Sequence, residues 1–223
     1  MALRRSLLPP AGLLVALLAF PSYSGAQLPP VGTLPPPPAK PPPSPQEPAP
    51  KVGEKAPDFT LPDKYGAPVK LSALLATPLT RRGEERRKDP WVLLVFYRGY
   101  WCPVCNSNLR NLQNHLDKFT AQGVRIVAVG IDPPDVTRKH VDKQGYSFTF
   151  LSDMEAEVIG RYDLLHEGGG PRRADVSHPA QFLIDSTGTV RWRNLAKGMP
   201  VVRPQDILRV IDELTLASSS APE

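Results

Sequence analysis

The feature that most constrains the fold is an apolar run at residues 91–97, which is followed closely by two cysteines. The run has no polar interruption, which is typical of a central strand buried on both faces. After it, Cys102 and Cys105 enclose Pro103-Val104, and an apolar stripe with helical spacing begins. The residues of that stripe recur at steps of four and three: Cys105, Leu109, Leu112, Leu116 and Phe119. The sequence therefore predicts a buried strand that delivers the cysteine pair to the start of a helix, which Gly123 ends.

Further hydrophobic patterns place short elements on both sides of this strand and helix. Residues 59–61 and 69–71 alternate around a turn and predict a small N-terminal hairpin, after which Ser72 is expected to cap a helical turn through Leu75. The expected elements after the cysteine helix are a strand at 124–131, a helix from Pro133 to about Gln144, a strand at 148–151, a helix at 155–162, a hairpin of 182–184 with 190–192, and a helix from Pro204. This order predicts an α/β fold with a mixed central sheet flanked by helices.

Residues 1–26 have the pattern of a secretory signal peptide. Arg4 and Arg5 precede a short apolar stretch, and the small residues Ser24-Gly25-Ala26 offer a cleavage site before Gln27. The stretch is short for a membrane span, and an uncleaved N-terminal anchor is the alternative. In either case we expect the domain to lie outside the cytoplasm, periplasmic or secreted, and to meet a membrane only if this segment is uncleaved.

Residues 27–51 are dominated by proline, of which the chain has 28. Because this segment has little apolar surface to bury, we expect an extended, disordered linker. A ligand for proline-binding modules is the other interpretation, which the expected location disfavours. The redox domain is then expected at 52–217, with a frayed tail at 218–223.

The charge and the cysteine count limit the classes of function. The net charge of +5 is mild and scattered, so it does not indicate nucleic-acid binding. A run of mixed charge at 80–89 is interpreted as a solvated surface insertion, with an anion-binding or partner-binding patch as the alternative. Two cysteines cannot build a disulfide framework or a four-ligand zinc site, and no His-x-x-x-His run accompanies them. We therefore expect neither a metal nor another cofactor.

The position of the cysteines predicts different environments for the two thiols. Cys102 would sit at the helix N-terminus, where unpaired N–H groups and the helix dipole stabilise a thiolate. Pro103 would occupy the first helical position, where a missing N–H costs nothing. Cys105 would lie one turn further, on the buried stripe. This predicts an exposed attacking thiol and a shielded resolving thiol, which suits disulfide exchange. The alternative is a non-enzymatic binding module on a tether whose disulfide is purely structural, although so short a loop would stabilise the fold little.

Three stretches outside the cysteine motif resemble a known family. They are the opening Val-Gly-Glu-Lys-Ala-Pro-Asp-Phe-Thr-Leu at 52–61, Phe96-Tyr97, and Phe182-Leu183-Ile184-Asp185. With the cysteine motif, they resemble the thioredoxin-like redoxins of the AhpC/TSA family from residue 52 to about residue 216. The resemblance implies a thioredoxin-like fold and a thiol-based oxidoreductase. It also implies partners that are protein or small-molecule thiols and disulfides, or hydroperoxides, together with a thiol reductant.

That family contains two chemistries, and this chain departs from one of them. Thioredoxin-like members exchange disulfides through a Cys-x-x-Cys pair, whereas peroxiredoxins use one cysteine at the position of Cys105, with Thr or Ser at that of Cys102. Arg98 replaces the peroxiredoxin proline, and His178-Pro179 stands near the expected helper arginine. These departures favour exchange. Arg172 and Arg173 lie close upstream of His178, and an activated thiolate can react with peroxide. An antioxidant thiol peroxidase is therefore the alternative.

Three residues beside the motif are expected to support the site. Trp101 is interpreted as a shield over the cysteines and a substrate contact, or as packing alone. The resemblance implies that Pro179 is a cis-proline facing the cysteines, with a trans loop proline as the alternative. His178 would then tune the thiolate, unless it is a surface histidine. Residues 168–170 predict a turn near the site. The buried acid that assists proton transfer in many thioredoxins is missing, because Phe96 occupies its position.

Overall fold

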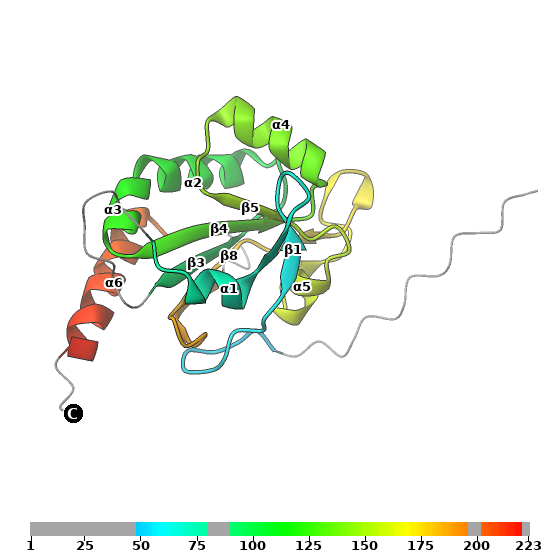
Figure 1. The fold of residues 1–223 in the computed structure, drawn as a ribbon. Helices are drawn as coiled ribbons and strands as arrows, with labels where there is room; N and C mark the ends of the chain where they lie inside the picture. Colours follow the sequence, from blue (N-terminus) through cyan, green and yellow to red (C-terminus); the bar gives the residue numbers. More distant parts are fainter. Residues whose placement is uncertain (1–47, 80–89, 196–201, 220–223) are drawn as a thin grey trace, which may run out of the picture. The chain divides into compact units, whose positions relative to one another are not determined.

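Strand β3 (Trp91–Phe96) lies at the centre of a five-stranded sheet with the order β5-β4-β3-β8-β9 (Figure 1). It pairs in parallel with β4 (Val124–Gly130) and antiparallel with β8 (Ala180–Ile184). β5 (Thr149–Ser152) continues the sheet in parallel beyond β4, and β9 (Val190–Leu195) continues it antiparallel beyond β8. Every β3 residue after the first is buried, because both faces of the sheet are covered. The mixed sheet and its buried central strand are as the sequence predicts.

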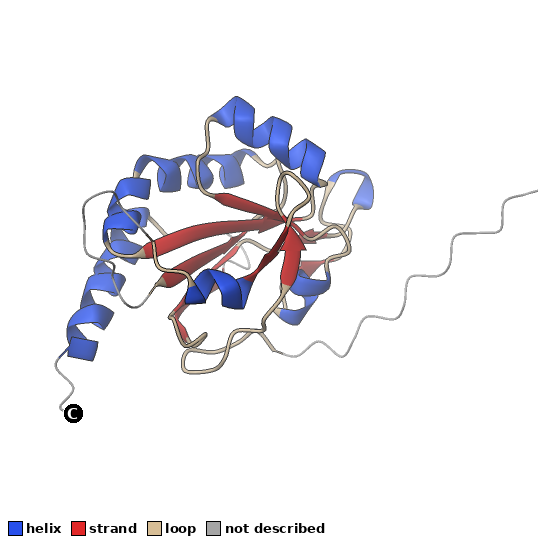
Figure 2. Cartoon of the chain, in the orientation of Figure 1, coloured by secondary structure: helices blue, strands red, loops and turns tan. Residues whose placement is uncertain are grey.

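The structure is a computed structural model that describes residues 48–79, 90–195 and 202–219. These residues belong to one compact unit. The predicted signal peptide, most of the predicted linker, the charged run at 80–89 and the chain end from residue 220 lie outside the described residues. Within the described ranges, no helix has both the length and the apolar character that a membrane span needs. Helices and strands alternate along much of the described chain, as Figure 2 shows.

One face of the sheet packs against two short helices. Successive side chains of a strand point to opposite faces, so Leu94 and Phe96 face the same apolar layer. Helices α1 (Leu71–Ala76) and α5 (Glu157–Arg161) supply buried residues to it. Figure 1 shows both of these helices below the sheet in that view, opposite α2 and α4. This layer supports β3 from the side away from the cysteine helix.

The other face carries the cysteines. Leu93 and Val95 pack there in a layer that includes both Cys102 and Cys105. Four helices contribute buried residues to this layer: α2 (Pro103–Asn114), α3 (Leu116–Ala121), α4 (Pro134–Gln144) and α6 (Pro204–Ser219). The cysteine pair is therefore part of the hydrophobic core on this side. Helix α6 also includes Ser218 and Ser219, which the sequence analysis placed in the tail.

The cysteine helix is broken where the sequence predicts continuity. The apolar stripe runs unbroken to Phe119, but α2 ends at Asn114 and α3 begins at Leu116. His115 between them has φ −114° and ψ 8°, and its Nδ1 lies 2.9 Å from the carbonyl oxygen of Asn111. Because the turn tightens only at this residue, Phe119 still reaches the core. The predicted stop at Gly123 is confirmed, with φ +72° just after α3.

The N-terminal hairpin is present, although its helix is capped differently from the prediction. β1 (Thr60–Pro62) pairs antiparallel with β2 (Pro68–Lys70), and α1 follows at once. Ser72 lies inside the helix and makes no side-chain cap, so that prediction is wrong. Instead, the backbone N–H of Ser72 donates to Oδ1 of Asp58 at 3.0 Å. A carboxylate from an earlier segment thus accepts one of the backbone N–H groups that would otherwise be unpaired at the start of this helix.

A second small hairpin lies between α5 and β8. β6 (Leu165–His166) pairs antiparallel with β7 (Val176–Ser177) and encloses the glycines at 168–170, where the sequence predicts a turn. A 3-10 turn, Pro171–Arg173, follows them. Its two arginines have φ values of 55° and 60°, which non-glycine residues rarely adopt. The chain then enters β8 through His178 and Pro179, at the end of the sheet where Ala180 pairs with Phe96.

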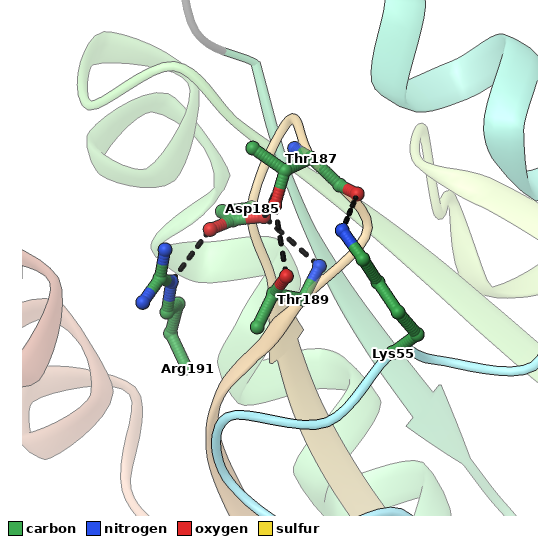
Figure 3. A network of polar contacts seen from close by, with 5 residues as sticks. All are labelled: Lys55, Asp185, Thr187, Thr189 and Arg191. Atoms are coloured by element: carbon green, nitrogen blue, oxygen red, sulfur yellow. Dashed lines mark hydrogen bonds and ion pairs between the residues drawn. The ribbon is translucent and has the colours of Figure 1, made fainter.

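The opposite end of the sheet carries the β8–β9 turn and a network of polar contacts (Figure 3). Oδ1 of Asp185 accepts hydrogen bonds from the backbone N–H groups of Thr187 and Thr189 at 2.9 and 3.0 Å. Its Oδ2 pairs with Nε of Arg191 at 2.5 Å. Burial alone would raise the pKa of Asp185, but these hydrogen bonds and the Arg191 charge hold it below its ordinary value. Lys55 donates to the carbonyl oxygen of Thr187 at 2.7 Å and joins the chain's N-terminal segment to this turn.

Candidate active site

The cysteine motif leaves β3 through a tight turn that requires glycine. The backbone N–H of Cys102 donates to the carbonyl oxygen of Gly99 at 3.1 Å, and the φ of Gly99 is +153°. A Cβ at this position would lie 2.6 Å from the indole nitrogen of Trp101, which is closer than real Cβ atoms come. A larger residue here would therefore displace Trp101, whose ring packs against the layer that holds the cysteines.

Cys102 and Cys105 form a disulfide at the first turn of α2, with 5.3 Å between their Cα atoms. Cys102 is the N-cap residue, and its Sγ accepts a hydrogen bond from the backbone N–H of Cys105 at 3.3 Å. Pro103 stands at the start of the helix, as predicted. The N–H that points at Cys102 would equally stabilise a thiolate after the disulfide is reduced.

The predicted difference in exposure between the two cysteines is wrong for this oxidised form. Each retains only 5% of its accessible surface. The Sγ of Cys102 is turned back over the helix start, because it is bonded to the Sγ of Cys105 and accepts the Cys105 N–H. The asymmetry that remains is one of position. Cys102 caps the helix, whereas Cys105 lies within its first turn.

Asp132 is a buried acid that the sequence analysis missed. It follows β4, the parallel neighbour of β3, and is 7% exposed. Its Oδ2 accepts the backbone N–H of Tyr100 at 2.7 Å, and its Oδ1 lies 3.3 Å from the position that a Gly99 Cβ would take. Burial raises the pKa of Asp132, although the hydrogen bond from Tyr100 opposes that rise. A carboxyl group whose pKa is raised thus lies under the turn that leads to Cys102.

Gln181 is a second buried polar residue on the cysteine side of the sheet. It lies opposite Val95 in the β3–β8 ladder and is 2% exposed. Paired residues of neighbouring strands point to the same face, so its side chain enters the layer of Val95 and the cysteines. Among the described residues, neither its amide nitrogen nor its amide oxygen has a hydrogen-bond partner. Unpartnered buried polar atoms lower the stability of the fold, and they are retained where a site uses them.

Trp101 is held between the cysteine motif and an arginine. The guanidinium carbon of Arg98 lies 5.1 Å from the centre of the indole ring, which is the geometry of a cation–π contact. Nη2 of Arg98 donates to the carbonyl oxygen of Gly169 in the β6–β7 hairpin. The predicted turn at 168–170 therefore does lie beside the cysteine motif.

His178 and Pro179 are placed as neighbours of the site, but not in the predicted form. The structure has no cis peptide bond in its described residues, so the bond before Pro179 is trans and the cis-proline expectation is wrong. Hydrogen bonding fixes the chain on both sides, since the N–H of His178 donates to Leu164 at 2.7 Å and Ala180 pairs with Phe96. The imidazole of His178 stacks on that of His166, with 4.4 Å between ring centres and 7° between planes.

A group of aromatic side chains borders the motif on the α4 side. Tyr100 is 49% exposed, and its ring centre lies 6.3 Å from that of the buried His140. Burial lowers the pKa of His140, and the nearby Lys143 lowers it further. His140 in turn packs on Tyr146, 5.8 Å away. Tyr100 is thus the exposed end of this group, next to Trp101.

No group of three His, Cys, Asp or Glu side chains with metal-binding geometry occurs among the described residues.

A central sheet whose middle strand leads into a Cys-x-x-Cys helix start defines a thioredoxin-type thiol redox protein. The comparisons with known proteins agree. The model of the AhpC/TSA family matches residues 52–193. The chain is 28% identical to alkyl hydroperoxide reductase E of Mycobacterium tuberculosis over 141 residues, which cover 62% of this chain and 81% of the relative. It is 29% identical to thiol-disulfide oxidoreductase ResA of Bacillus thuringiensis over 135 residues, which cover 60% of this chain and 64% of that protein.

The structural comparison supports the same fold. The crystal structure of peroxidoxin BcpB from Mycobacterium tuberculosis matches with a TM-score of 0.62 at 21% identity, covering 74% of this chain and 98% of the other. The chain belongs to the AhpC/TSA family, and it is a thiol-based oxidoreductase with a thioredoxin-like fold.

Proposed function

We propose that this protein catalyses thiol–disulfide exchange through Cys102 and Cys105, outside the cytoplasm. The observation that carries the proposal is the bond between these cysteines at the N-terminus of α2, with Cys102 as the capping residue. A sulfur in that place is a stabilised thiolate when reduced, and its partner lies within bonding distance without a change in the backbone. The similarity to a protein named thiol-disulfide oxidoreductase supports the same chemistry.

The exchange proceeds in two balanced steps. The Cys102 thiolate attacks one sulfur of a substrate disulfide, so that a mixed disulfide forms and the first substrate thiolate leaves. Cys105 then gives up its proton and attacks the Cys102 sulfur, which forms the intramolecular disulfide and releases the second substrate thiolate. The protein loses two electrons and the substrate gains them. The reverse sequence oxidises a dithiol substrate.

Asp132 supplies the proton transfer in this proposal. Resolution requires a group that takes the Cys105 proton, and the position used in many thioredoxins is occupied by Phe96. Asp132 approaches the motif from β4 instead, through Gly99 and Tyr100. Because burial raises its pKa, this carboxyl can take up a proton and return it to a leaving thiolate.

Peroxide reduction is the second candidate function, and the relative named alkyl hydroperoxide reductase E favours it. In this reaction a thiolate attacks one peroxide oxygen, the O–O bond breaks, and an alcohol or water leaves. The sulfenic acid so formed condenses with the other thiol, which releases water and gives the same Cys102–Cys105 disulfide. Two electrons pass from the protein to the peroxide, and a thiol reductant restores the dithiol.

One experiment separates the two functions. The reduced protein, Cys102→Ser and Cys105→Ser are each given hydrogen peroxide and, separately, an oxidised protein substrate. We expect exchange in the wild type, a stable mixed disulfide with Cys105→Ser, and no reaction with Cys102→Ser. Peroxide consumption that survives in Cys102→Ser and disappears in Cys105→Ser would assign the protein to peroxide reduction instead.

The location has its own test. Expression of the full chain in a Gram-negative host, followed by fractionation and mass measurement, is expected to give an extracytoplasmic protein that begins at Gln27. A cytoplasmic protein that retains Met1 would contradict this part of the proposal.

A further inference from the structure

Arg98 has an unusual combination of contacts for a cation beside a redox site. It lies four residues before Cys102, and its guanidinium stacks on Trp101, the residue that precedes that cysteine. Among the described residues, no carboxylate pairs with it. The acidic groups of the neighbouring hairpin are Glu167, which is exposed, and Asp175, which accepts the backbone N–H of Gly168 at 3.0 Å.

The hydrogen bonds of Arg98 leave part of its guanidinium unused. Nη2 donates to the carbonyl oxygen of Gly169. Nε is buried and has no partner among the described groups. Nη1 makes no hydrogen bond to a described residue, and it is not a fully buried atom. Because the residue as a whole is only partly buried, Nη1 reaches solvent. The guanidinium is thus fixed at two points, by Gly169 and by Trp101, and retains an open donor.

The hairpin that holds Arg98 is closely packed at the point of contact. A Cβ at Gly169 would lie 2.4 Å from Nδ1 of His166, so the glycine backbone rests directly on that imidazole. His166 is in turn stacked on His178. Arg172 and Arg173 lie in the same hairpin and are both exposed. Arg98 and this hairpin together carry three arginines against the two acids Glu167 and Asp175, and the Arg98 guanidinium is held by Gly169 and Trp101, which favours an anionic ligand.

We propose that Arg98 and Trp101 form a subsite for the carboxylate of a small anionic disulfide or of the corresponding thiol, beside the Cys102–Cys105 pair. The carboxylate would bind the open edge of the guanidinium, while the carbon chain of the ligand lies along the indole ring. Arginine suits this role better than lysine, because its planar guanidinium can stack on an aromatic ring while the N–H groups of Nη1 bind a carboxylate. This inference rests on the proposed exchange function and adds a substrate class to it.

The test uses three disulfides of similar size that differ in charge. Bis(2-hydroxyethyl) disulfide is neutral, 3,3′-dithiodipropionate is anionic and cystamine is cationic. The protein, reduced beforehand and freed of reductant, is mixed with an excess of each, and formation of the intramolecular disulfide is followed by free-thiol titration and Trp fluorescence. One protein dithiol then converts one disulfide into two thiols, so no other reductant is needed.

We expect Arg98→Met to lower the ratio of the anionic to the neutral second-order rate constant by about tenfold. The ratio of the cationic to the neutral rate constant should move in the opposite direction. Arg98→Lys keeps the charge but loses the planar group that stacks on Trp101, and should give an intermediate ratio. Arg209→Met removes an exposed arginine from α6 and should leave both ratios as in the wild type.

Rate constants that change by the same factor for all three disulfides in Arg98→Met would overturn the subsite, because they would mean that Arg98 acts only on the cysteines or the fold. A wild-type protein that no disulfide oxidises would instead refute the exchange function itself. Circular dichroism of each variant shows whether it is folded. If Arg98→Met is not, the same comparison with Arg98→Lys decides the question.

Discussion

The β8–β9 turn at one end of the central sheet and the cysteine motif at the other differ in how fully the buried polar groups beside them are hydrogen-bonded. At the β8–β9 turn, Asp185 is satisfied by backbone N–H groups, by Thr187 and by Arg191. At the cysteine end, the described structure leaves buried polar atoms without partners: Nε of Arg98, Oδ1 of Asn106, Nε2 of His140 and both amide atoms of Gln181. Away from the turn but near the same end as Asp185, Nε of Arg125 also has no partner among the described groups. Paired groups stabilise a fold, whereas unpaired ones lower its stability and are retained where a site needs them. We infer that the first end serves the fold and the second the chemistry.

The largest effect on stability is expected at the paired end. Asp185→Ala removes a buried carboxylate and leaves two backbone N–H groups and Arg191 without their acceptor. Because hydrogen bonds to a charged group are involved, we expect a loss of about 2–3 kcal/mol in the free energy of unfolding, measured in urea. The rate of disulfide exchange of the folded protein should stay at the wild-type value.

Asp135→Ala is the matched control, since Asp135 is an exposed acid whose ion-pair partner among the described residues is Lys139 on α4. It should leave the free energy of unfolding nearly unchanged. An equal loss in both variants, or a slower exchange in Asp185→Ala, would mean that the two ends are not separate in function.

The next effect is expected from Asp132→Asn at the cysteine end. Removal of the acid should slow resolution of the mixed disulfide about tenfold or more at neutral pH, because the amide cannot take the Cys105 proton. Quenched-flow measurement of the mixed disulfide over a range of pH checks this. A profile identical to that of the wild type would exclude Asp132 from proton transfer.

The same variant has a pH-dependent effect on stability. Burial raises the pKa of Asp132 in the folded state above its unfolded value. The folded state therefore binds more protons, and the wild type loses stability as the pH rises from the unfolded pKa through the raised one. Asp132→Asn lacks this titration, so its stability relative to the wild type should increase over that range. Glu213→Gln, at an exposed position on α6, should follow the wild type throughout.

A smaller effect, of opposite sign to that of Asp185→Ala, is expected for Gln181→Leu. The change replaces an unpartnered buried amide by an apolar group of similar size, so the free energy of unfolding should rise by about 1 kcal/mol. Gln113→Leu is the matched control, because Gln113 is bonded to Ser147 through both of its amide atoms. That variant should lose stability, and a loss in Gln181→Leu as well would show that its amide is paired in solution.

Much of the architecture could be predicted, because buried strands and helices have recognisable patterns of apolar residues in the sequence. The run at 91–97 has no polar residue, and the strand is buried on both faces. The end of the helix at Gly123 could also be predicted, because glycine readily adopts the left-handed φ that often follows a helix, and Gly123 does so. The break at His115 could not be predicted, because the apolar stripe continues through it and only the local backbone changes. The prediction that the Cys102 thiol is exposed was wrong for a related reason. Sequence spacing places a residue on a helix, but it does not indicate the direction in which a disulfide turns the sulfur.

The groups around the cysteines were harder to predict because they come from other strands. Asp132 carried a signal, since it is an acid directly after an apolar run whose end meets that of β3 in a parallel sheet. Gln181 carried one too, as the polar residue in the otherwise apolar strand Ala-Gln-Phe-Leu-Ile. The contact between Arg98 and Gly169 joins residues 71 positions apart, and no local pattern indicates it.

In the proposed exchange reaction, Cys102 attacks the substrate disulfide and Cys105 resolves the mixed disulfide. The most direct measurement is the mass of each single-cysteine variant after reaction with a small disulfide reagent that forms a mixed disulfide with a protein thiol. Peptide mapping then identifies the modified residue. We expect rapid and stable adduct formation on Cys102 in Cys105→Ser, and little reaction of Cys105 in Cys102→Ser. Rapid modification of Cys105 in Cys102→Ser, with Cys102 inert in Cys105→Ser, would contradict it.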